Sequence, residues 1–343
     1  MEIGVYTFAD VGTHPSTGES IGWHERMINL MEEIELADQL GLDVFGIGEH
    51  HRPDYAVSSP ATVLAAAAVK TQQIKLTSAV TVLSSEDPVR VFQQFATVDQ
   101  LSGGRAEIMA GRGSFIESFP LFGYNLTDYD ELFSEKLEML LELNRSEKIQ
   151  WKGRHTQDID NRGVYPRPYN EQIPIWIAVG GTPESVVRAA EHGLPMALAI
   201  IGGQPARFRR YVQLYRDIYS QRNHPPHQMK LSINSHVFVA EDSKQARDIF
   251  YPTYAEVMGR IGRERGWPPL TRQQFDEATK KDGALLVGSV QEVIEKMLYH
   301  HDLFDHTRFL AQMSLGALPH KDSMKALELL GTKVAPTVKK LLS

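Results

Sequence analysis

The stretch DVFGIGEHHRP, residues 43–53, combines a short apolar run with a cluster of titratable side chains. The run Val44–Ile47 is β-branched and aromatic, which is typical of a strand buried on both faces. A segment with helical spacing ends just before it at Gly41, a residue suited to the left-handed conformation that closes a helix. Such a unit is typical of parallel α/β proteins, in which chemistry lies at the C-terminal ends of the strands. The first candidates for a functional site are therefore Glu49, His50 and His51.

The same order of helix, glycine, apolar strand and polar end recurs along the chain. Further strands are predicted at residues 2–8, 74–83, 105–110, 173–179, 195–201, 231–240 and 307–312. Helices are predicted at residues 23–40, 60–70, 89–101, 128–144, 185–192, 205–221, 289–301 and 321–342. This alternation favours an α/β fold, a closed (β/α)8 TIM barrel forming one domain over residues 1–343, with insertions in its loops at 147–172 and 256–283. An open doubly wound sheet is the alternative, but no G-x-G-x-x-G motif follows the first strand.

The composition restricts the class of protein. The chain has 343 residues, of which 42% are hydrophobic and 23% charged, as in soluble globular enzymes. Its net charge of −7 offers no basic surface for nucleic acid or for an anionic membrane. There are no cysteines, which excludes disulfides, thiolate catalysis and iron–sulfur clusters. No apolar run approaches the roughly 20 residues that span a bilayer, so we expect a cytoplasmic protein.

The two histidines after the second strand could carry acid–base chemistry. Neighbouring strand residues point to opposite faces, so His50 and His51 cannot both face the barrel interior if the strand extends that far. A neutral imidazole can take or give a proton near pH 7, and structural hydrogen bonding is the alternative role. No H-E-x-x-H or other helix-spaced ligand set is present, so no metal site is predicted. The other doublet, His300-His301, lies between polar residues of a helix and is predicted to be a solvated surface pair.

A glycine-rich loop, GGTPES at residues 180–185, lies between a strand and a helix. Its glycines would let backbone N–H groups approach an anion, the helix N-terminus adds partial positive charge, and Thr182 and Ser185 offer hydroxyls. These features describe a phosphate cradle. The alternative is an ordinary helix cap, because Thr182 followed by Pro183 can serve that role alone.

A second strand end, GRGS at residues 111–114, places an arginine between glycines. The planar guanidinium of Arg112 suits a phosphate, while a salt bridge at the barrel rim is the alternative. Small residues also occupy the middle of a strong strand at 78–81. They would leave room for a flat ring system against the backbone, or they would simply pack tightly in the barrel core.

Several segments, in order along most of the chain, resemble the bacterial luciferase-like monooxygenase superfamily of flavin-dependent enzymes. They are LGLDVFGIGEHH (40–51), AVTVLSSEDPVRVFQQFATVDQLSGGRAEIMAGRG (79–113), AVGGTPES (178–185), HGLPMALA (192–199), VAEDSKQAR (239–247) and LGALPHKDSMKALELLGTKVAP (315–336). The resemblance implies FMN at the C-terminal mouth of a (β/α)8 barrel, with a non-proline cis peptide near Ala79-Val80. It implies a catalytic role for His50. The cofactor-binding residues that it implies are Ala79, Val80, Arg112, Gly113, Ser114, Gly180, Gly181 and Thr182.

The function that this resemblance implies is an FMN-dependent monooxygenase that uses reduced FMN and O2 to oxidise a small organic substrate. The reduced flavin would come from a separate reductase or from transient binding of NAD(P)H, and the protein would be a homodimer. A deazaflavin (F420) enzyme that transfers hydride is the alternative within the superfamily. A flavin-binding protein without turnover and a metal-dependent barrel hydrolase are alternatives from other classes. Nothing in the sequence identifies the substrate.

Overall fold

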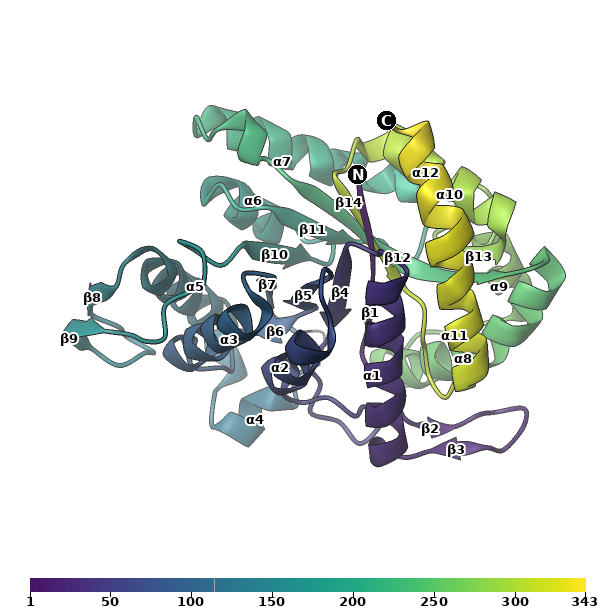
Figure 1. The fold of residues 1–343 in the computed structure, drawn as a ribbon, viewed down its shortest axis with the longest axis horizontal. Helices are drawn as coiled ribbons and strands as arrows, with labels where there is room; N and C mark the ends of the chain where they lie inside the picture. Colours follow the sequence, from purple (N-terminus) through teal and green to yellow (C-terminus); the bar gives the residue numbers. More distant parts are fainter. Residues whose placement is uncertain (114) are drawn as a thin grey trace.

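In the computed structural model, which describes residues 1–113 and 115–343, eight parallel strands close into a barrel (Figure 1). They are β1 (Glu2–Thr7), β4 (Val44–Ile47), β5 (Lys75–Ser78), β7 (Ala106–Gly111), β10 (Ile175–Val179), β11 (Met196–Ala199), β12 (Leu231–Ala240) and β14 (Arg308–Gln312). They pair in that order, and β14 pairs with β1 to close the ring. The predicted (β/α)8 TIM barrel is therefore confirmed.

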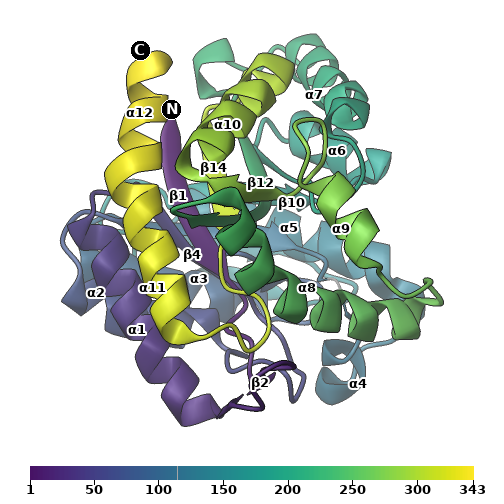
Figure 2. The same cartoon turned by 90° about the vertical axis from the view of Figure 1, so that its right-hand side faces the viewer.

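Helices surround the barrel, and both chain termini lie at the end where the barrel strands begin (Figures 1 and 2). The long helices are α1 (Trp23–Gln39), α2 (Pro60–Lys70), α3 (Pro88–Ser102), α5 (Tyr129–Arg145), α6 (Pro183–Glu191), α7 (Arg209–Gln221), α8 (Ser243–Arg265), α10 (Val290–Phe304), α11 (His320–Leu329) and α12 (Ala335–Leu341). Apolar side chains fill the layer between strands and helices, and a smaller cluster fills the barrel itself. Within the described ranges, no helix is long and apolar enough to cross a membrane.

Two predicted loops and one predicted strand carry more structure than the sequence indicated. The strand expected at 74–83 is interrupted after Ser78, where the Ala79–Val80 peptide is cis, and β6 (Thr81–Val82) then pairs again with β7. In the insertion at 147–172, β8 (Lys148–Trp151) and β9 (Ile159–Gly163) form a hairpin at the left edge of Figure 1. The loop after β1 contains a smaller hairpin of β2 (Gly12–Thr13) and β3 (Ser20–Ile21).

The prediction of an insertion at 256–283 was wrong for much of that segment. Helix α8 continues to Arg265, and α9 (Arg272–Ala278) follows it. A short strand that the sequence did not indicate, β13 (Leu286–Ser289), then pairs with the C-terminal half of β12. The segment therefore forms part of the helical layer, with α8 lying on the side of the barrel where the strands end (Figure 2).

The prediction that His300 is on the surface was also wrong. Its side chain is fully buried, with its ring against Phe304 and Phe309. The reason is helical spacing: Met297, His300 and Phe304 follow each other at intervals of three and four residues, which places them on the buried face of α10. The flanking polar residues misled the sequence argument because they lie on the other face.

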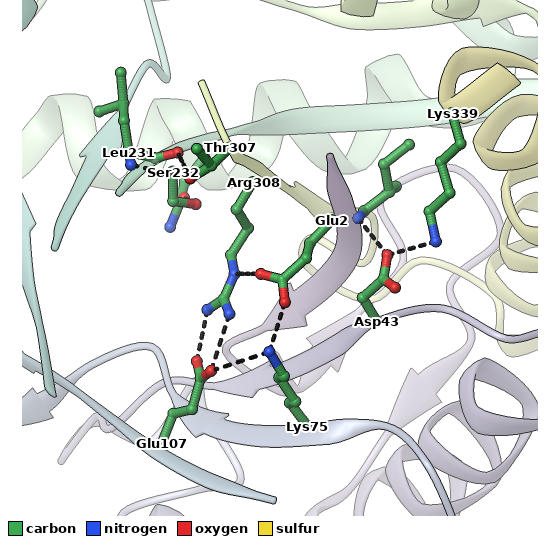
Figure 3. A network of polar contacts seen from close by, with 11 residues as sticks. Glu2, Asp43, Lys75, Glu107, Leu231, Ser232, Thr307, Arg308 and Lys339 are labelled. Carbon is green, nitrogen blue, oxygen red and sulfur yellow. Dashed lines mark hydrogen bonds and ion pairs between the residues drawn. The ribbon is translucent and has the colours of Figure 1, made fainter. Parts of the chain in front are cut away.

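A network of ion pairs fills the N-terminal end of the barrel interior (Figure 3). Arg308 of β14 donates to both carboxylate oxygens of Glu107 on β7, at 2.6 and 2.9 Å, and to Glu2 at 2.7 Å. Lys75 donates to Glu2 at 2.5 Å, and the Arg308 guanidinium lies 4.2 Å from the centre of the Trp176 ring. Burial alone would raise the pKa of Glu2, but the charge of Arg308 lowers it to about 2. This end of the barrel is closed by charges that satisfy one another.

Candidate active site

A cavity of about 240 Å³ lies at the opposite end of the barrel, where the strands end. Most of the predicted site residues line it: His50, Ala79, Val80, Arg112, Gly113, Gly180 and Thr182. Gly181 lies between two of these residues without lining the cavity, and Ser114 lies outside the described residues. Strand ends that are far apart in the sequence thus meet around one space, as a parallel barrel requires.

His50 lies in an aromatic cage at the edge of this cavity. Its ring is stacked on Tyr55 at 4.2 Å between centres and meets Phe8 and Phe115 edge-on at 4.6 and 5.3 Å. Burial, and then the positive charges of His51 and Arg52, lower the pKa of His50 to about 3. The imidazole is therefore neutral at pH 7, and its buried Nε2 has no hydrogen-bond partner among the described residues. A neutral imidazole with a free nitrogen is available to a molecule bound in the cavity.

The side chains of Glu49 and His51 pair with each other and hold the strand end in place, and Glu49 also lines the cavity beside His50. The His51 Nε2 lies 2.9 Å from one Glu49 carboxylate oxygen, and the other oxygen accepts the backbone N–H of Val82 at 2.8 Å. The Glu49 side chain therefore ties the end of β4 to the segment that follows the cis peptide. Of the histidine doublet, only His50 lines the cavity; β4 ends at Ile47, so strand alternation does not extend to these residues.

The floor of the cavity is flat and apolar beside the cis peptide of Ala79 and Val80. A Cβ atom at Gly111 would lie only 2.8 Å from the side chain of Val80, so glycine is required there for the Val80 side chain to fit. Ala178 and Ala197, on the next strands, add only methyl groups to the cavity wall. Of the residues at 78–81, Ala79 and Val80 line the cavity, and both also pack in or against the cluster that fills the barrel.

Arg112 anchors the polar end of the cavity. Its Nη2 donates to the hydroxyls of Thr182 and Ser185, both at 3.1 Å, and its Nη1 donates to Asp130 at 2.6 Å. Thr182 precedes α6 but makes no capping bond; its hydroxyl donates instead to Ser185 at 3.0 Å. Gly181 has a φ of +102°, which permits this tight turn at low cost. The rim salt bridge is present, but the hydroxyls of the glycine loop are organised around the guanidinium rather than used as a helix cap.

Sequence reasoning missed a second cation at this end. Arg188 lies one turn after Ser185 on α6, with its guanidinium 5.1 Å from the centre of the Phe133 ring. Its Nη1 is buried and has no partner among the described residues. Burial, and then the charge of Arg112, lower the pKa of Arg188, so the two guanidinium groups are close enough to repel each other. The spacing of three residues from Ser185, on a helix that follows a glycine loop, was the signal that could have identified it.

Other residues that the sequence did not single out lie across the cavity from Arg112 or beside it. Tyr129 places its ring 5.1 Å from the Arg112 guanidinium, and its hydroxyl donates to the Arg112 carbonyl at 3.3 Å. Tyr6, Phe8 and Asn234 complete the wall. Among residues 1–113 and 115–343, no three His, Asp or Glu side chains converge as metal ligands. The arrangement can hold an anion at one end and a flat apolar group along the floor, next to a neutral histidine.

The chain is similar to known proteins in sequence and in fold. The sequence model of the luciferase-like monooxygenase family matches residues 1–307. An F420-dependent glucose-6-phosphate dehydrogenase of Amycolatopsis mediterranei (strain U-32) is 28% identical over 162 residues, which cover 45% of this chain and 48% of that protein.

Two solved structures superpose over nearly the whole chain. The monooxygenase RslO1 from Streptomyces bottropensis has a TM-score of 0.83 at 23% identity and covers 98% of this chain and 99% of its own. The oxygenating constituent of 3,6-diketocamphane monooxygenase from Pseudomonas putida, solved with FMN, has a TM-score of 0.78 at 18% identity and covers 98% of each chain. With a family match over residues 1–307, the chain belongs to the luciferase-like monooxygenase family.

Proposed function

We propose that the protein is an FMN-dependent monooxygenase that oxidises a small organic substrate with reduced FMN and O2. The observation that carries this proposal is the pairing of two features at the strand ends. Arg112 and the hydroxyls of Thr182 and Ser185 form an anion site at the start of α6, and the Ala79–Val80 segment forms a flat apolar floor beside it. The phosphate and the ring system of FMN need these two surfaces side by side.

The charges around the anion site favour FMN over F420. Asp130 pairs with Arg112 and is 71% exposed, and Glu184 in the first turn of α6 is also exposed. Both carboxylates lie close enough to act electrostatically on Arg188. F420 carries further carboxylates beyond its phosphate, which would meet this acidic rim, whereas the FMN chain ends at its phosphate. The neighbouring diketocamphane enzyme, whose structure contains FMN, supports the same choice.

The residues of the chain would bind the flavin, exclude water and handle a proton. Reduced FMN, when bound, supplies the electrons with which O2 oxidises the substrate. Phe8, Tyr55 and Phe115 surround the His50 ring and keep water from it. Since His50 is neutral with a pKa of about 3, its Nε2 can hold a proton or accept a hydrogen bond at the edge of the cavity.

Arg52 closes the mouth of the site. Its guanidinium lies 4.4 Å from the centre of the Phe115 ring and donates to Glu117 at 2.6 Å and to Glu264, near the end of α8, at 2.5 Å. These contacts tie the loop after β4 to the loop after β7 and to α8. A closed mouth would protect the reaction from water, and an oxygen-activating site needs to exclude water.

We also propose that the enzyme works as a single domain and a cytoplasmic homodimer that receives its reduced flavin from a reductase or through NAD(P)H. The dimer would form through α2 and α3, where Val69 is 63% and Leu101 48% exposed. Sedimentation equilibrium of the protein and of a Val69→Glu, Leu101→Glu variant tests this part. A monomeric protein, or a variant that remains dimeric, would contradict it.

A titration tests the flavin proposal. Purified protein is titrated with FMN, reduced FMN and F420, and binding is followed by flavin absorbance and fluorescence. We expect selective binding of FMN, weakened by Arg112→Ala and unaffected by Arg145→Ala, which removes an exposed arginine at the far end of α5. Oxygen consumption with reduced FMN then distinguishes an enzyme from a binding protein. Binding of F420 alone would change the reaction to hydride transfer, and binding of neither would refute the proposal.

A further inference from the structure

A row of polar side chains crosses three adjacent strands on the side of the barrel opposite to Arg112. Asn234 of β12 lines the cavity, and His236, two residues further along the strand, lies on the same face. Gln312 of β14 is the register partner of His236, and Tyr6 of β1, which lines the cavity, is the register partner of Gln312. In the ring of eight strands β14 lies four positions from β7, the strand that leads to Arg112. The row therefore faces the anion site across the barrel.

Two members of this row have no partner for their polar atoms among the described residues. Both ring nitrogens of His236 and the amide nitrogen of Gln312 are buried without a hydrogen bond. His236 is 3% exposed and Gln312 1% exposed. Neither residue lines the cavity itself, but each lies next to Asn234 or Tyr6, which do, on the same face of the strands. Because buried polar groups are almost always paired, this unpaired set is available to a partner that the chain does not supply. Asn234 accepts the Ser232 hydroxyl at 2.7 Å, which leaves its own NH2 group free to donate.

The row is neutral. Burial lowers the pKa of His236 to about 4, so at pH 7 one ring nitrogen donates and the other accepts. Burial also raises the pKa of Tyr6, which keeps its phenol protonated. Of two arginines at the mouth, Arg52 is paired with Glu117 and Glu264, and Arg260 lies 2.9 Å from a carboxylate oxygen of Asp54. The Nε and Nη2 of Arg260 make no hydrogen bond among the described residues.

Helix α8 covers this side of the mouth. Its Tyr254 meets the His236 ring edge-on, at 5.7 Å between centres, and its Arg260 pairs with the loop after β4. Figure 2 shows the helix on the side where the barrel strands end. A molecule held between the flavin floor and α8 would therefore present its polar group to the row.

We propose that His236 and Gln312, with Asn234 and Tyr6, bind a carbonyl or hydroxyl oxygen of the substrate, and that the substrate is a neutral molecule. This inference rests on the proposed function, since it assigns the anion site to FMN and leaves the opposite wall to the substrate. A carboxylate or sulfonate would meet no unpaired cation in this row. A hydrocarbon would leave the buried donors and acceptors unsatisfied, which disfavours its binding.

A set of three matched probes tests the inference. Para-fluorophenol, fluorobenzene and para-fluorobenzoate are titrated by fluorine NMR at pH 7, with and without saturating FMN. We expect the phenol to bind more tightly than both others. His236→Phe and Gln312→Met should each weaken phenol binding about three- to tenfold, the usual worth of one hydrogen bond, and leave fluorobenzene within about twofold. His300→Phe is the matched control, because His300 is equally buried and neutral but lies on α10 against Phe304 and Phe309.

The outcomes separate this inference from the proposed function. Equal binding of phenol and fluorobenzene, tighter binding of the benzoate, binding of none of the probes, or no effect of His236→Phe would each overturn the substrate assignment. FMN affinity is measured in the same samples by flavin fluorescence. If FMN fails to bind while the phenol is still selected in its absence, the proposed function fails and the polar row stands. If FMN binds but the phenol is not selected, only the row is refuted.

Discussion

Both ends of the barrel carry buried or partly buried arginines, but the arginines at the two ends have different partners. At the end where the strands begin, Arg308 is 1% exposed and has carboxylate partners in Glu107 and Glu2 and an aromatic ring beneath it. At the end where the strands finish, Arg112 is 19% exposed and shares its donors between two hydroxyls and the exposed Asp130. Near it, Arg188 keeps a buried Nη1 without a partner among the described residues.

This difference separates structure from function within one barrel. A buried charge whose partners lie within the protein has a structural role, whereas an unpartnered polar group beside the cavity is available to a ligand. The missing partner is informative only beside the cavity, because His300 and His306, which do not line it, also have buried ring nitrogens without a partner among the described residues. The same distinction applies to His50 and His236. At the end where the strands finish, both have buried ring nitrogens without a partner among the described residues. We expect substitutions at the end where the strands begin to change stability, and substitutions at the end where the strands finish to change binding.

The largest expected effect is on stability, from Arg308→Met. The substitution leaves the buried Glu107 carboxylate with Lys75, at 3.8 Å, as its remaining cationic partner. Breaking a buried ion pair on one side costs about 3–5 kcal/mol, so the free energy of unfolding in urea should fall by about that amount. Adding Glu107→Leu should recover part of the loss, because it removes the unpaired charge.

Arg112→Met, at the end of the barrel where the strands finish, is the control for that measurement. Arg112→Met removes a pair with an exposed carboxylate, which contributes no more than about 1 kcal/mol. A loss at Arg112 as large as the loss at Arg308 would contradict the comparison between the two ends.

The second effect is on FMN binding, again from Arg112→Met. Hydrogen bonds to charged groups contribute about 1.5–3 kcal/mol, so the dissociation constant for FMN should rise about 10- to 100-fold. Binding is measured by quenching of flavin fluorescence at fixed ionic strength. In Arg308→Met, studied under conditions where it remains folded, FMN affinity should not change, and a comparable loss there would show that the effect at Arg112 is indirect.

The fold could be predicted from the sequence because local pattern and global position agree in most units. The apolar runs at 44–47 and 231–240 form β4 and β12, and α2 begins at Pro60 and ends at Lys70 as predicted. Arg112 and Thr182 could be paired in advance because β7 and β10, the strands that precede them, are neighbours in a closed barrel.

What the sequence could not provide depends on contacts between distant residues. Arg308 and Glu107 are separated by 201 positions, and nothing local marks either as a partner of the other. His300 was placed on the surface because its neighbours are polar, although its own spacing follows the buried face of α10. Gln312 and His236 belong to one row only because β12 and β14 pair in register.

The third effect compares two buried histidines through pH. Burial lowers the pKa of both His50 and His300 to about 3, below the ordinary value of about 6.5. The unfolded chain therefore binds more protons between those values, and stability is lost as the pH falls through that window. Between pH 7 and 5 each histidine should cost about 2 kcal/mol.

His300→Leu and His50→Leu should each remove about 2 kcal/mol from the stability lost between pH 7 and 5, as measured by urea unfolding at the two pH values. Only His50→Leu should lower oxygen consumption with reduced FMN, because only His50 borders the cavity. An equal loss of turnover in the His300 variant would remove the distinction between a histidine that packs and a histidine that acts.

The smallest effect is expected from Arg188→Met. This substitution tests whether Arg188 contributes to stability or to FMN binding. Because Nη1 of Arg188 has no hydrogen-bond partner among the described residues and the neighbouring Arg112 repels it, the substitution should leave the free energy of unfolding unchanged or slightly higher. FMN affinity should fall by about three- to tenfold at low salt, since a second positive charge near the phosphate is lost, and the fall should shrink as salt screens that charge. A loss of stability with unchanged FMN affinity would make Arg188 a structural residue like Arg308.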